Sequence, residues 1–453
     1  MQWIKSFSAL VLTASVTLAG CGSDNNDSET VVTTPTVQLK LVHAAVDAPN
    51  VNATGGPVFN VSNIAFAKAS APTSVPATGL SMAVSAILPD NSTLPVLTPA
   101  LSFVAGQSYT AYAVGKVADN SLSALLVNAP AATPTAGNAL LQVVHAASNA
   151  PTVDVHLTAP TASLSSSTVT ATLPFKQFTG AVSVPAGNYR IRITPAGAPA
   201  TVVFDSGTVA IPAGANWQVA AIDNRFSGPS PVSLLAIDPQ GVTTDIKDAA
   251  STSSVRVVHA VADAPAVDVL LNNSKAITAL KFPEFTGYAQ VTPGTYNVKV
   301  AANANNAVVV INADLNLAAG NYATVLATGS LTANSIKPWV LADTPRRIAT
   351  AAQVRIAHAS TVAGRVDIYV TPTQDIATAT PAFRDVPFMA ETGYVALKPG
   401  SYVVTVTPTG SKTAAIGPVA LNLMGNKIYT AVARDGVANA LPSLILMDDF
   451  IAK

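Results

Sequence analysis

The string VHAVADAPAVDV occupies residues 258–269, and a close copy, VHAASNAPTVDV, occupies residues 144–155. Looser versions occur at residues 42–52 (VHAAVDAPNVN) and 357–368 (AHASTVAGRVDI). The four histidines are 102, 114 and 99 residues apart, and an Asp or Asn follows each of them nine residues later. The paired positions are His43 and Asn52, His145 and Asp154, His259 and Asp268, and His358 and Asp367. A fixed offset repeated in this way predicts four copies of one structural unit.

Two further blocks recur after the histidine motifs, the first of them in the second, third and fourth copies. In the third copy, FTGYAQVTPGTYNVKV at residues 285–300 ends in alternating apolar and polar side chains, which predicts a strand with one buried face. The block LAAGNYATVLATG at residues 317–329 again places a glycine turn before an apolar strand. Strand signals about 8–12 residues apart, without a long helical period, indicate a small antiparallel β-sandwich.

The blocks divide the chain into a tandem array of four β-sandwich units joined by polar or small-residue linkers. The first unit is divergent, because it lacks the Gly-x-Tyr strand start and has Asn52 at the aspartate position. The predicted segments are a signal peptide at 1–21, a flexible tether at 22–36, and sandwich units at 37–128, 139–238, 253–343 and 351–449. At about 100 residues, each unit is large enough to fold without disulfides.

The charge of the chain excludes one class of partner. It carries 24 basic and 24 acidic residues, so its formal net charge is zero, and only 11% of its residues are charged. A neutral chain has no basic field with which to attract nucleic acid. We therefore expect no nucleic-acid partner.

The N-terminus resembles that of a bacterial lipoprotein. Lys5 precedes an apolar run of 12 residues, Phe7 to Leu18, which is too short to span a bilayer. Leu18-Ala19-Gly20-Cys21 follows, and Cys21 is the only cysteine in the chain. The resemblance to a lipobox implies lipidation of Cys21 and a membrane anchor of several acyl chains. A glycine after the cysteine, by the same resemblance, favours the outer membrane of a bacterial cell envelope.

The three recurring blocks resemble the bacterial domain-of-unknown-function 4397 family over nearly all of the mature chain. The matching strings are VRVVHAxxDAPxVDV, GYxxVxPGTYxVxV and LxAGxxYT, and the third copy matches them best. The resemblance implies extracytoplasmic sandwiches of immunoglobulin-like or prealbumin-like form. It implies no catalytic residue, because the family has no established activity.

An enzyme or a metal site is less consistent with the sequence than a structural motif. The chain has no H-E-x-x-H, no G-x-S-x-G and no phosphate-binding glycine loop. A His-Asp pair supplies two ligands where a closed zinc site needs four, although His145, Asp154 and His156 together offer three. Calcium bound by a loop such as ILPDNST is a further alternative. We predict no catalytic residue, no metal and no cofactor.

The function indicated is that of a structural or interaction protein, such as a stalk, adhesin or scaffold. Four sandwiches in a row would form a rod tethered to the membrane, with an envelope or extracellular macromolecule as partner. The alternative is an envelope binding module for a small ligand or glycan, although only Trp217 and Trp339 remain for stacking on a sugar after the signal peptide is removed. We expect each His-Asp pair to hold a buried turn together, since buried backbone amides need partners.

Overall fold

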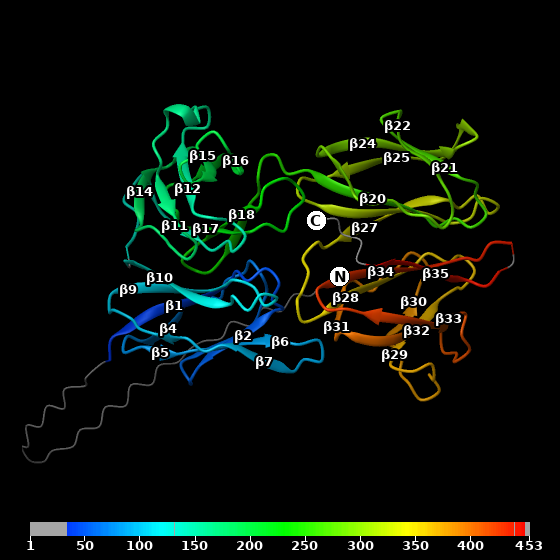
Figure 1. Cartoon of the computed structure of the whole chain (residues 1–453), viewed down its shortest axis with the longest axis horizontal. Coiled ribbons are helices and arrows are strands. Elements are labelled where there is room, and N and C mark those ends of the chain that lie inside the picture. The colour runs from blue at the N-terminus through cyan, green and yellow to red at the C-terminus, as the bar shows by residue number, and fades with distance from the viewer. Residues whose placement is uncertain (1–33, 131, 439, 449–453) are drawn as a thin grey trace, which may run out of the picture. The chain divides into compact units, whose positions relative to one another are not determined.

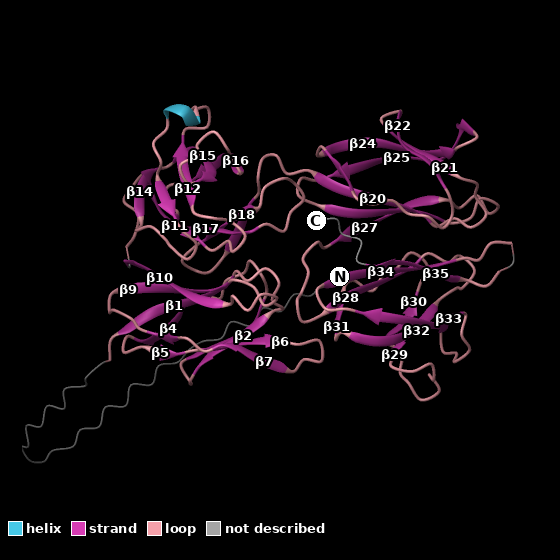
Figure 2. Ribbon diagram, in the orientation of Figure 1, coloured by secondary structure: helices cyan, strands magenta, loops and turns pink. Residues whose placement is uncertain are grey.

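The computed structural model describes residues 34–130, 132–438 and 440–448 (Figure 1). The predicted signal peptide, Cys21 and most of the predicted tether lie outside this part of the chain. Within it, strands predominate, and the one helical element is a 3₁₀ turn, η1 at Leu164–Ser166 (Figure 2). No helix of the described residues is long and apolar enough to cross a bilayer. The predicted all-β class is confirmed.

The described chain forms four sandwiches, each built from two sheets of four or five strands. We call the sheet that contains the motif histidine the histidine sheet, and the sheet that contains the Asp or Asn nine residues later the aspartate sheet. The histidine sheets have the orders β10-β9-β1-β4, β14-β11-β17-β18-β19, β23-β20-β26-β27 and β31-β28-β34-β35. The aspartate sheets have the orders β3-β2-β6-β7, β13-β12-β15-β16, β22-β21-β24-β25 and β30-β29-β32-β33.

The strand bounds follow the recurring blocks. Sandwich 1 contains β1 (Thr36–His43), β2 (Val51–Gly55), β3 (Phe59–Ile64), β4 (Thr73–Pro76), β5 (Leu80–Ser81), β6 (Ala83–Ile87), β7 (Thr93–Leu97), β8 (Ala100–Leu101), β9 (Gln107–Val114) and β10 (Ser123–Pro130). Sandwich 2 contains β11 (Asn138–His145), β12 (Val153–Thr158), β13 (Ala171–Leu173), β14 (Val182–Pro185), β15 (Gly187–Pro195), β16 (Phe204–Ile211), β17 (Asn216–Asp223), β18 (Val232–Ile237) and β19 (Thr243–Ile246).

The second half of the chain repeats this arrangement. Sandwich 3 contains β20 (Ser253–His259), β21 (Val267–Leu271), β22 (Ser274–Leu280), β23 (Ala289–Val291), β24 (Gly294–Ala302), β25 (Asn305–Leu317), β26 (Tyr322–Thr328) and β27 (Lys337–Asp343). Sandwich 4 contains β28 (Ala352–His358), β29 (Val366–Thr371), β30 (Phe383–Val386), β31 (Val395–Leu397), β32 (Gly400–Pro408), β33 (Ile416–Leu423), β34 (Lys427–Arg434) and β35 (Ser443–Asp448).

One strand pair in each histidine sheet is parallel, which the sequence did not reveal. The strand that ends in the motif histidine pairs in parallel with the strand of the last recurring block (LAAGNYATVLATG in the third copy), which we call the late-block strand. In sandwich 3 these strands are β20 and β26, and their paired residues run from Ser254 opposite Tyr322 to His259 opposite Ala327. The same pairing joins β1 to β9, β11 to β17 and β28 to β34. The other pairs of strands in the eight large sheets are antiparallel, as the spacing of the strand signals predicts.

The central strands of each histidine sheet are buried on both faces, because the sandwiches share cores in pairs. One core joins sandwiches 1 and 2, with Val42 and Tyr112 on one side and Val144 and Ile222 on the other. A second core joins sandwiches 3 and 4 through residues such as Leu326 and Val432. Each sandwich also has a core between its own two sheets. The expected rod of independent units is therefore wrong for the described chain.

Burial on both faces explains the Ala-rich strands that fit poorly with an ordinary half-exposed sheet. In β1, Leu39 and Leu41 point into sandwich 1, whereas Val42 points into the core shared with sandwich 2. Strands covered on two sides carry continuous apolar runs instead of alternating ones. Alanines such as Ala220 and Ala357 occupy the shared cores, where small side chains let two sheets approach closely.

The polar stretches between units are bonded to the sandwiches. The stretch 239–252 contains β19, which pairs with β18 and so lengthens the histidine sheet of sandwich 2. In the stretch 344–352, the Ala349 amide donates to Asp47 O at 2.8 Å. The polar composition of both stretches predicts linkers. Composition does not show that their backbone groups pair with the sandwiches.

Candidate functional site

The motif histidine closes the loop that follows its strand. Nε2 of His259 lies 3.0 Å from Pro265 O, and Nδ1 accepts from the Val261 amide at 3.4 Å. This pairing fits a neutral ring that donates from Nε2 and accepts at Nδ1. Nε2 contacts a carbonyl oxygen six residues later in every copy, at 2.9, 2.9 and 2.7 Å for His43, His145 and His358.

Burial keeps these four rings neutral. Desolvation lowers the pKa of His43 to about 4, and it is also the main cause of a lowered pKa at His145, His259 and His358. Each ring also packs edge-on against a phenylalanine with centroids 5.9–6.5 Å apart. The phenylalanines are Phe66, Phe175, Phe282 and Phe388. Their recurrence is a signal that the sequence reading missed.

The Asp or Asn nine positions after each histidine bonds to other turns than the histidine does. The carboxylate of Asp268 accepts from the Ala279 amide at 2.9 Å and from the side chains of Asn303 and Asn306 at 2.8 and 2.9 Å. The ammonium of Lys275, together with these donors, holds the pKa of Asp268 well below its usual range.

The other copies use this position in the same way. Asp154 accepts from the Gly197 amide and Asp367 from the Gly410 amide, at 2.8 and 2.9 Å. Asn52 accepts from the Asn63 amide at 2.9 Å, so an amide side chain serves as well as a carboxylate. His and Asp of one motif therefore hold two separate turns, where the sequence suggested a single shared one.

Each sandwich has a further Asp that joins two loops, and the loop that carries it alternates from one sandwich to the next. Asp47 and Asp263, four residues after the first and third motif histidines, each accept two backbone amides from the loop after the late-block strand. In sandwiches 2 and 4 the acid lies on that other loop, as Asp223 and Asp435, and accepts from the loop after the motif histidine. Sandwiches 1 and 3 are thus alike, and so are 2 and 4.

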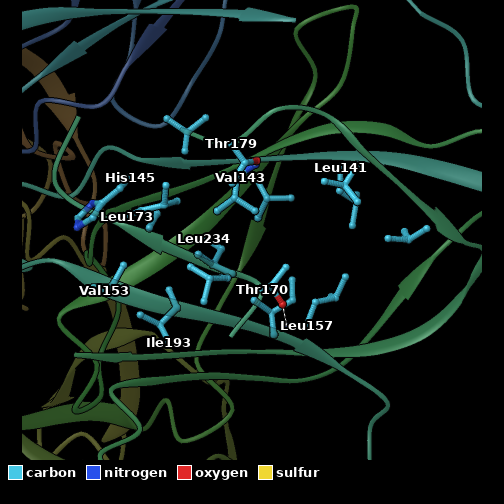
Figure 3. A pocket seen from close by; sticks show the side chains of 17 residues that line it. Leu141, Val143, His145, Val153, Leu157, Thr170, Leu173, Thr179, Ile193 and Leu234 are labelled. Carbon is cyan, nitrogen blue, oxygen red and sulfur yellow. Dashed lines mark hydrogen bonds between the residues drawn. The ribbon is translucent and has the colours of Figure 1, made fainter. Parts of the chain in front are cut away.

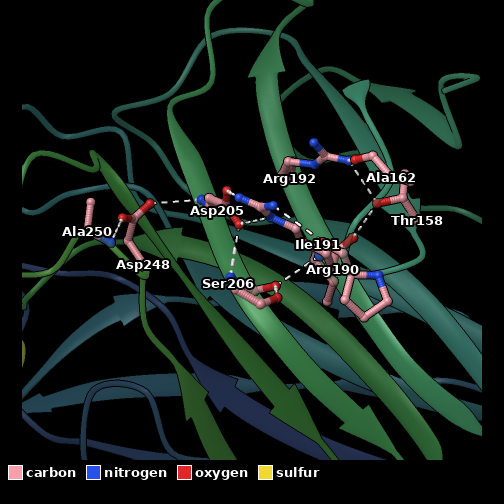
Figure 4. Close-up of polar contacts among 11 residues, drawn as sticks. Thr158, Ala162, Arg190, Ile191, Arg192, Asp205, Ser206, Asp248 and Ala250 are labelled. Carbon is pink, nitrogen blue, oxygen red and sulfur yellow. Dashed lines mark hydrogen bonds and ion pairs between the residues drawn. The ribbon is translucent and has the colours of Figure 1, made fainter. Parts of the chain in front are cut away.

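A polar cluster fastens the stretch after sandwich 2 to that sandwich (Figure 4). Arg190 forms an ion pair with Asp205, and its Nε donates to both carboxylate oxygens at 2.8 and 3.0 Å. The Asp205 amide donates to Asp248 at 2.8 Å. Nearby, Arg192 donates to Thr158 Oγ1 and Ala162 O, both at 2.9 Å. These contacts tie β15 and β16 to the stretch that follows β19.

A cleft of about 800 Å³ runs along the seam between sandwiches 1 and 2; we call it the seam cleft. Its lining includes Lys40, Gln142, Ala181, Trp217 and Gln218. The size falls in the range of about 300–1,000 Å³ that is typical of ligand sites. Sequence reasoning did not find it, because it combines residues from two units.

A smaller apolar cavity of about 90 Å³ lies inside sandwich 2, between its two sheets (Figure 3). Leu141 and Leu157 line one end, and Val153, Ile193 and Leu234 line the other. The interior of this sandwich is accordingly divided into two apolar clusters, with the cavity between them. The polar groups at its wall include the hydroxyls of Thr170 and Thr179, which accept backbone amides at 3.0 Å.

Comparison with known proteins places the chain in a family. The domain of unknown function DUF4397 matches residues 26–156, 161–245 and 253–369. The chain belongs to the DUF4397 family. No curated protein matches it.

Solved structures similar to this DUF4397 protein include two crystal structures of BcpA, the major pilin subunit of Bacillus cereus. One, of a BcpA variant, shares 9% identity over 66% of this chain and 99% of the pilin chain, with a TM-score of 0.15. The other shares 11% identity over 67% of this chain and the whole pilin chain, with a TM-score of 0.14.

The geometry gives no support to a metal site formed by His145, Asp154 and His156 in this DUF4397 protein. His145 is bonded to Pro151 O, and Asp154 to Thr172 and Gly197. Nδ1 of His156 lies 3.4 Å from a serine hydroxyl. Across the described residues, no group of three or more His, Cys, Asp or Glu is placed to hold a metal ion.

Ala221→Val in this DUF4397 protein is expected to raise the free energy of unfolding by about 1 kcal/mol, because the added carbons fill the apolar cavity that Ala221 lines. The matched control is Ala220→Val, since Ala220 points the other way into the packed shared core. Overpacking there should lower the free energy by about 1–3 kcal/mol. Urea unfolding of both variants checks the pair, and equal effects of one sign would contradict the assignment of the two faces.

Proposed function

We propose that the chain is a lipid-anchored structural or interaction protein of the bacterial cell envelope, held at the outer membrane and acting without catalysis as an adhesin or scaffold. The proposed anchor is Cys21, supported by the lipobox-like string that precedes it and by the following Gly22. The proposed partners are the membrane, through the lipid, and an envelope or extracellular macromolecule.

The observation that supports the proposal is that the recurring polar residues bond to loops of the protein itself. His259 and Asp268, the strongest candidates for chemistry in the sequence, are both buried and bonded to backbone and side chains of loops around them. The same positions do the same work in four sandwiches that share cores in pairs. Such an arrangement favours a rigid protein whose outer surface contacts a partner.

We extend the family assignment to sandwich 4, which lies mostly beyond residue 369, where the family match ends. His358 contacts a carbonyl oxygen six residues later, and Asp367 accepts the Gly410 amide, as their counterparts do in the other sandwiches. The shared turns support four copies of one domain. A binding module for a small ligand or glycan is the second candidate function, favoured by the seam cleft.

Replacing the anchor cysteine tests the proposed function. Cys21→Ser should move the protein from the membrane fraction to the soluble fraction, because the acyl chains can no longer be attached. Fractionation of the native host followed by mass spectrometry of the N-terminus is the measurement, and Ser23→Ala provides a control that leaves the thiol intact. A wild-type protein that is already soluble, or that begins at another residue, would show that the anchor does not exist.

A further inference from the structure

The apolar cavity of sandwich 2 is an elongated space that runs along its strands (Figure 3). Its lining follows β11 from Leu141 to His145 on one sheet and β12 from Val153 to Leu157 on the other. Four residue steps along a strand cover about 13 Å. A volume of about 90 Å³ stretched over that length gives a narrow slot, which suits a chain better than a ring.

The cavity opens between the edges of the two sheets. Val182 belongs to β14, the edge strand of the histidine sheet, and it lines the cavity although it is 51% exposed. Thr170 lies next to β13, the edge strand of the aspartate sheet, and it also lines the cavity and is exposed. A ligand can therefore enter between these two residues without separating the strands of either sheet.

The wall of the cavity is hydrocarbon and carries no charge. Among the described residues that line it, all are aliphatic except Thr170, Thr179 and His145. Both threonine hydroxyls accept backbone amides at 3.0 Å, and Nε2 of His145 lies 2.9 Å from Pro151 O. A charged or polar group inside would lose its water without gaining a partner, so the wall selects an apolar ligand.

Sandwiches 3 and 4 carry a larger side chain at the equivalent place. The residue after each motif Asp has a partner directly opposite it on the neighbouring strand, and such pairs share one face of the sheet. In sandwich 2 the pair is Val155 and Ala171, and Val155 lines the cavity. The partner is Ile277 in sandwich 3 and Phe383 in sandwich 4, and both pack against the core of their own sandwich.

Sandwich 1 fills its interior by another route. The equivalent pair there is Ala53 and Val61. Phe59 lies two residues before Val61, and so on the same face, and its ring is fully buried in the core. Sandwich 2 thus has the smallest partner of the four, Ala171, beside an apolar space that is open at one edge.

We propose that the cavity of sandwich 2 binds an unbranched alkyl chain whose head group stays at the mouth. An empty apolar space lowers stability in proportion to its volume, and a hydrocarbon that enters it restores the missing contacts. This inference goes beyond the structural role proposed above, because it adds a small ligand. It depends neither on the Cys21 anchor nor on the seam cleft.

The test is isothermal titration calorimetry of the full chain carrying Cys21→Ser, which keeps the protein's own acyl chains out of the measurement. The probes are 1-hexanol, 1-octanol and octanoate, with 1,8-octanediol as the comparison. 1-Octanol should bind saturably and about tenfold more tightly than 1-hexanol, because two more methylenes are buried. Octanoate should bind about as tightly as 1-octanol, since its head group stays outside. 1,8-Octanediol should bind at least tenfold more weakly, because one of its hydroxyls must enter the apolar interior.

A substitution that fills the cavity connects this binding to the site. Ala171→Ile introduces the residue of sandwich 3 and should weaken binding of 1-octanol by about tenfold or more. Ala210→Ile makes the same change at an exposed position of β16 and should leave binding unchanged. Sedimentation with phosphatidylcholine vesicles distinguishes the source of the chain. Sedimentation that Ala171→Ile abolishes indicates a membrane lipid, and its absence indicates a free amphiphile.

Three results would overturn the inference: no saturable binding of 1-octanol up to its solubility limit, 1,8-octanediol binding as tightly as 1-octanol, or Ala171→Ile binding as tightly as the wild type. Circular dichroism monitors the folding of each variant. If Ala171→Ile does not fold, Ala221→Val decides by the same criterion, since Ala221 also lines the cavity. Membrane fractionation tests the anchor separately, so either proposal can fail without the other.

Discussion

Arg355→Ala is expected to lower the free energy of unfolding of the pair of sandwiches 3 and 4 by about 3–5 kcal/mol, because it leaves the Asp343 carboxylate buried without its ionic partner. Both side chains of this ion pair are fully buried, and Arg355 also donates to Ala342 O at 2.9 Å. The loss is a large fraction of the roughly 5–15 kcal/mol that stabilises an ordinary domain.

Urea unfolding followed by tryptophan fluorescence measures this effect. Trp339 packs against the core shared by sandwiches 3 and 4, so it reports on the affected pair. Arg365→Ala is the matched control, since Arg365 and Asp385 form an ion pair that is more than half exposed and should contribute about 0–1 kcal/mol. Equal losses for Arg355→Ala and Arg365→Ala would refute the distinction drawn from burial.

Acidification from pH 7 to pH 4.5 is expected to destabilise the protein through its motif histidines. Burial lowers the pKa of His43 from 6.5 to about 4, so the unfolded chain binds a proton in this window and the folded chain does not. Stability therefore falls as the pH falls below 6.5. At about 1.4 kcal/mol for each pKa unit, His43 alone accounts for about 2–3 kcal/mol, and the other three motif histidines act in the same direction.

The measurement is the free energy of unfolding in urea at several pH values. Aspartates with lowered pKa values, such as Asp154, lose their stabilising effect only below about pH 4, so they stay outside the window. His43→Gln should make the pH dependence shallower, because one titrating ring is removed. A slope unchanged by His43→Gln would show that this ring does not titrate between the folded and unfolded states.

The sequence predicted the fold to the extent that local patterns determine it. The repeated His and Asp, the Gly-x-Tyr strand starts and the glycine turns identify strands and their order within each unit. They do not show which sheet faces which. The parallel pair β20–β26 joins segments more than sixty residues apart, and nothing local marks its direction.

The pairing of sandwiches leaves two traces in the sequence. Alanine is a poor strand residue, yet Ala220 and Ala357 lie in sheets that are covered on two faces. The alternation of the third acid, Asp47 and Asp263 against Asp223 and Asp435, indicates a unit of two sandwiches repeated twice. The seam cleft could not be predicted, because its walls come from units that only tertiary packing brings together.

The double pairing of β1 governs how the protein responds to a mechanical load. β1 is paired in parallel with β9 from Gln38 to His43 and antiparallel with β4 from Thr36 to Leu39. A load directed along β1 runs along both ladders, so it stretches many hydrogen bonds at once. Bonds strained together resist more force than bonds opened one after another. The two ladders of β1 therefore share such a load instead of opening one bond at a time.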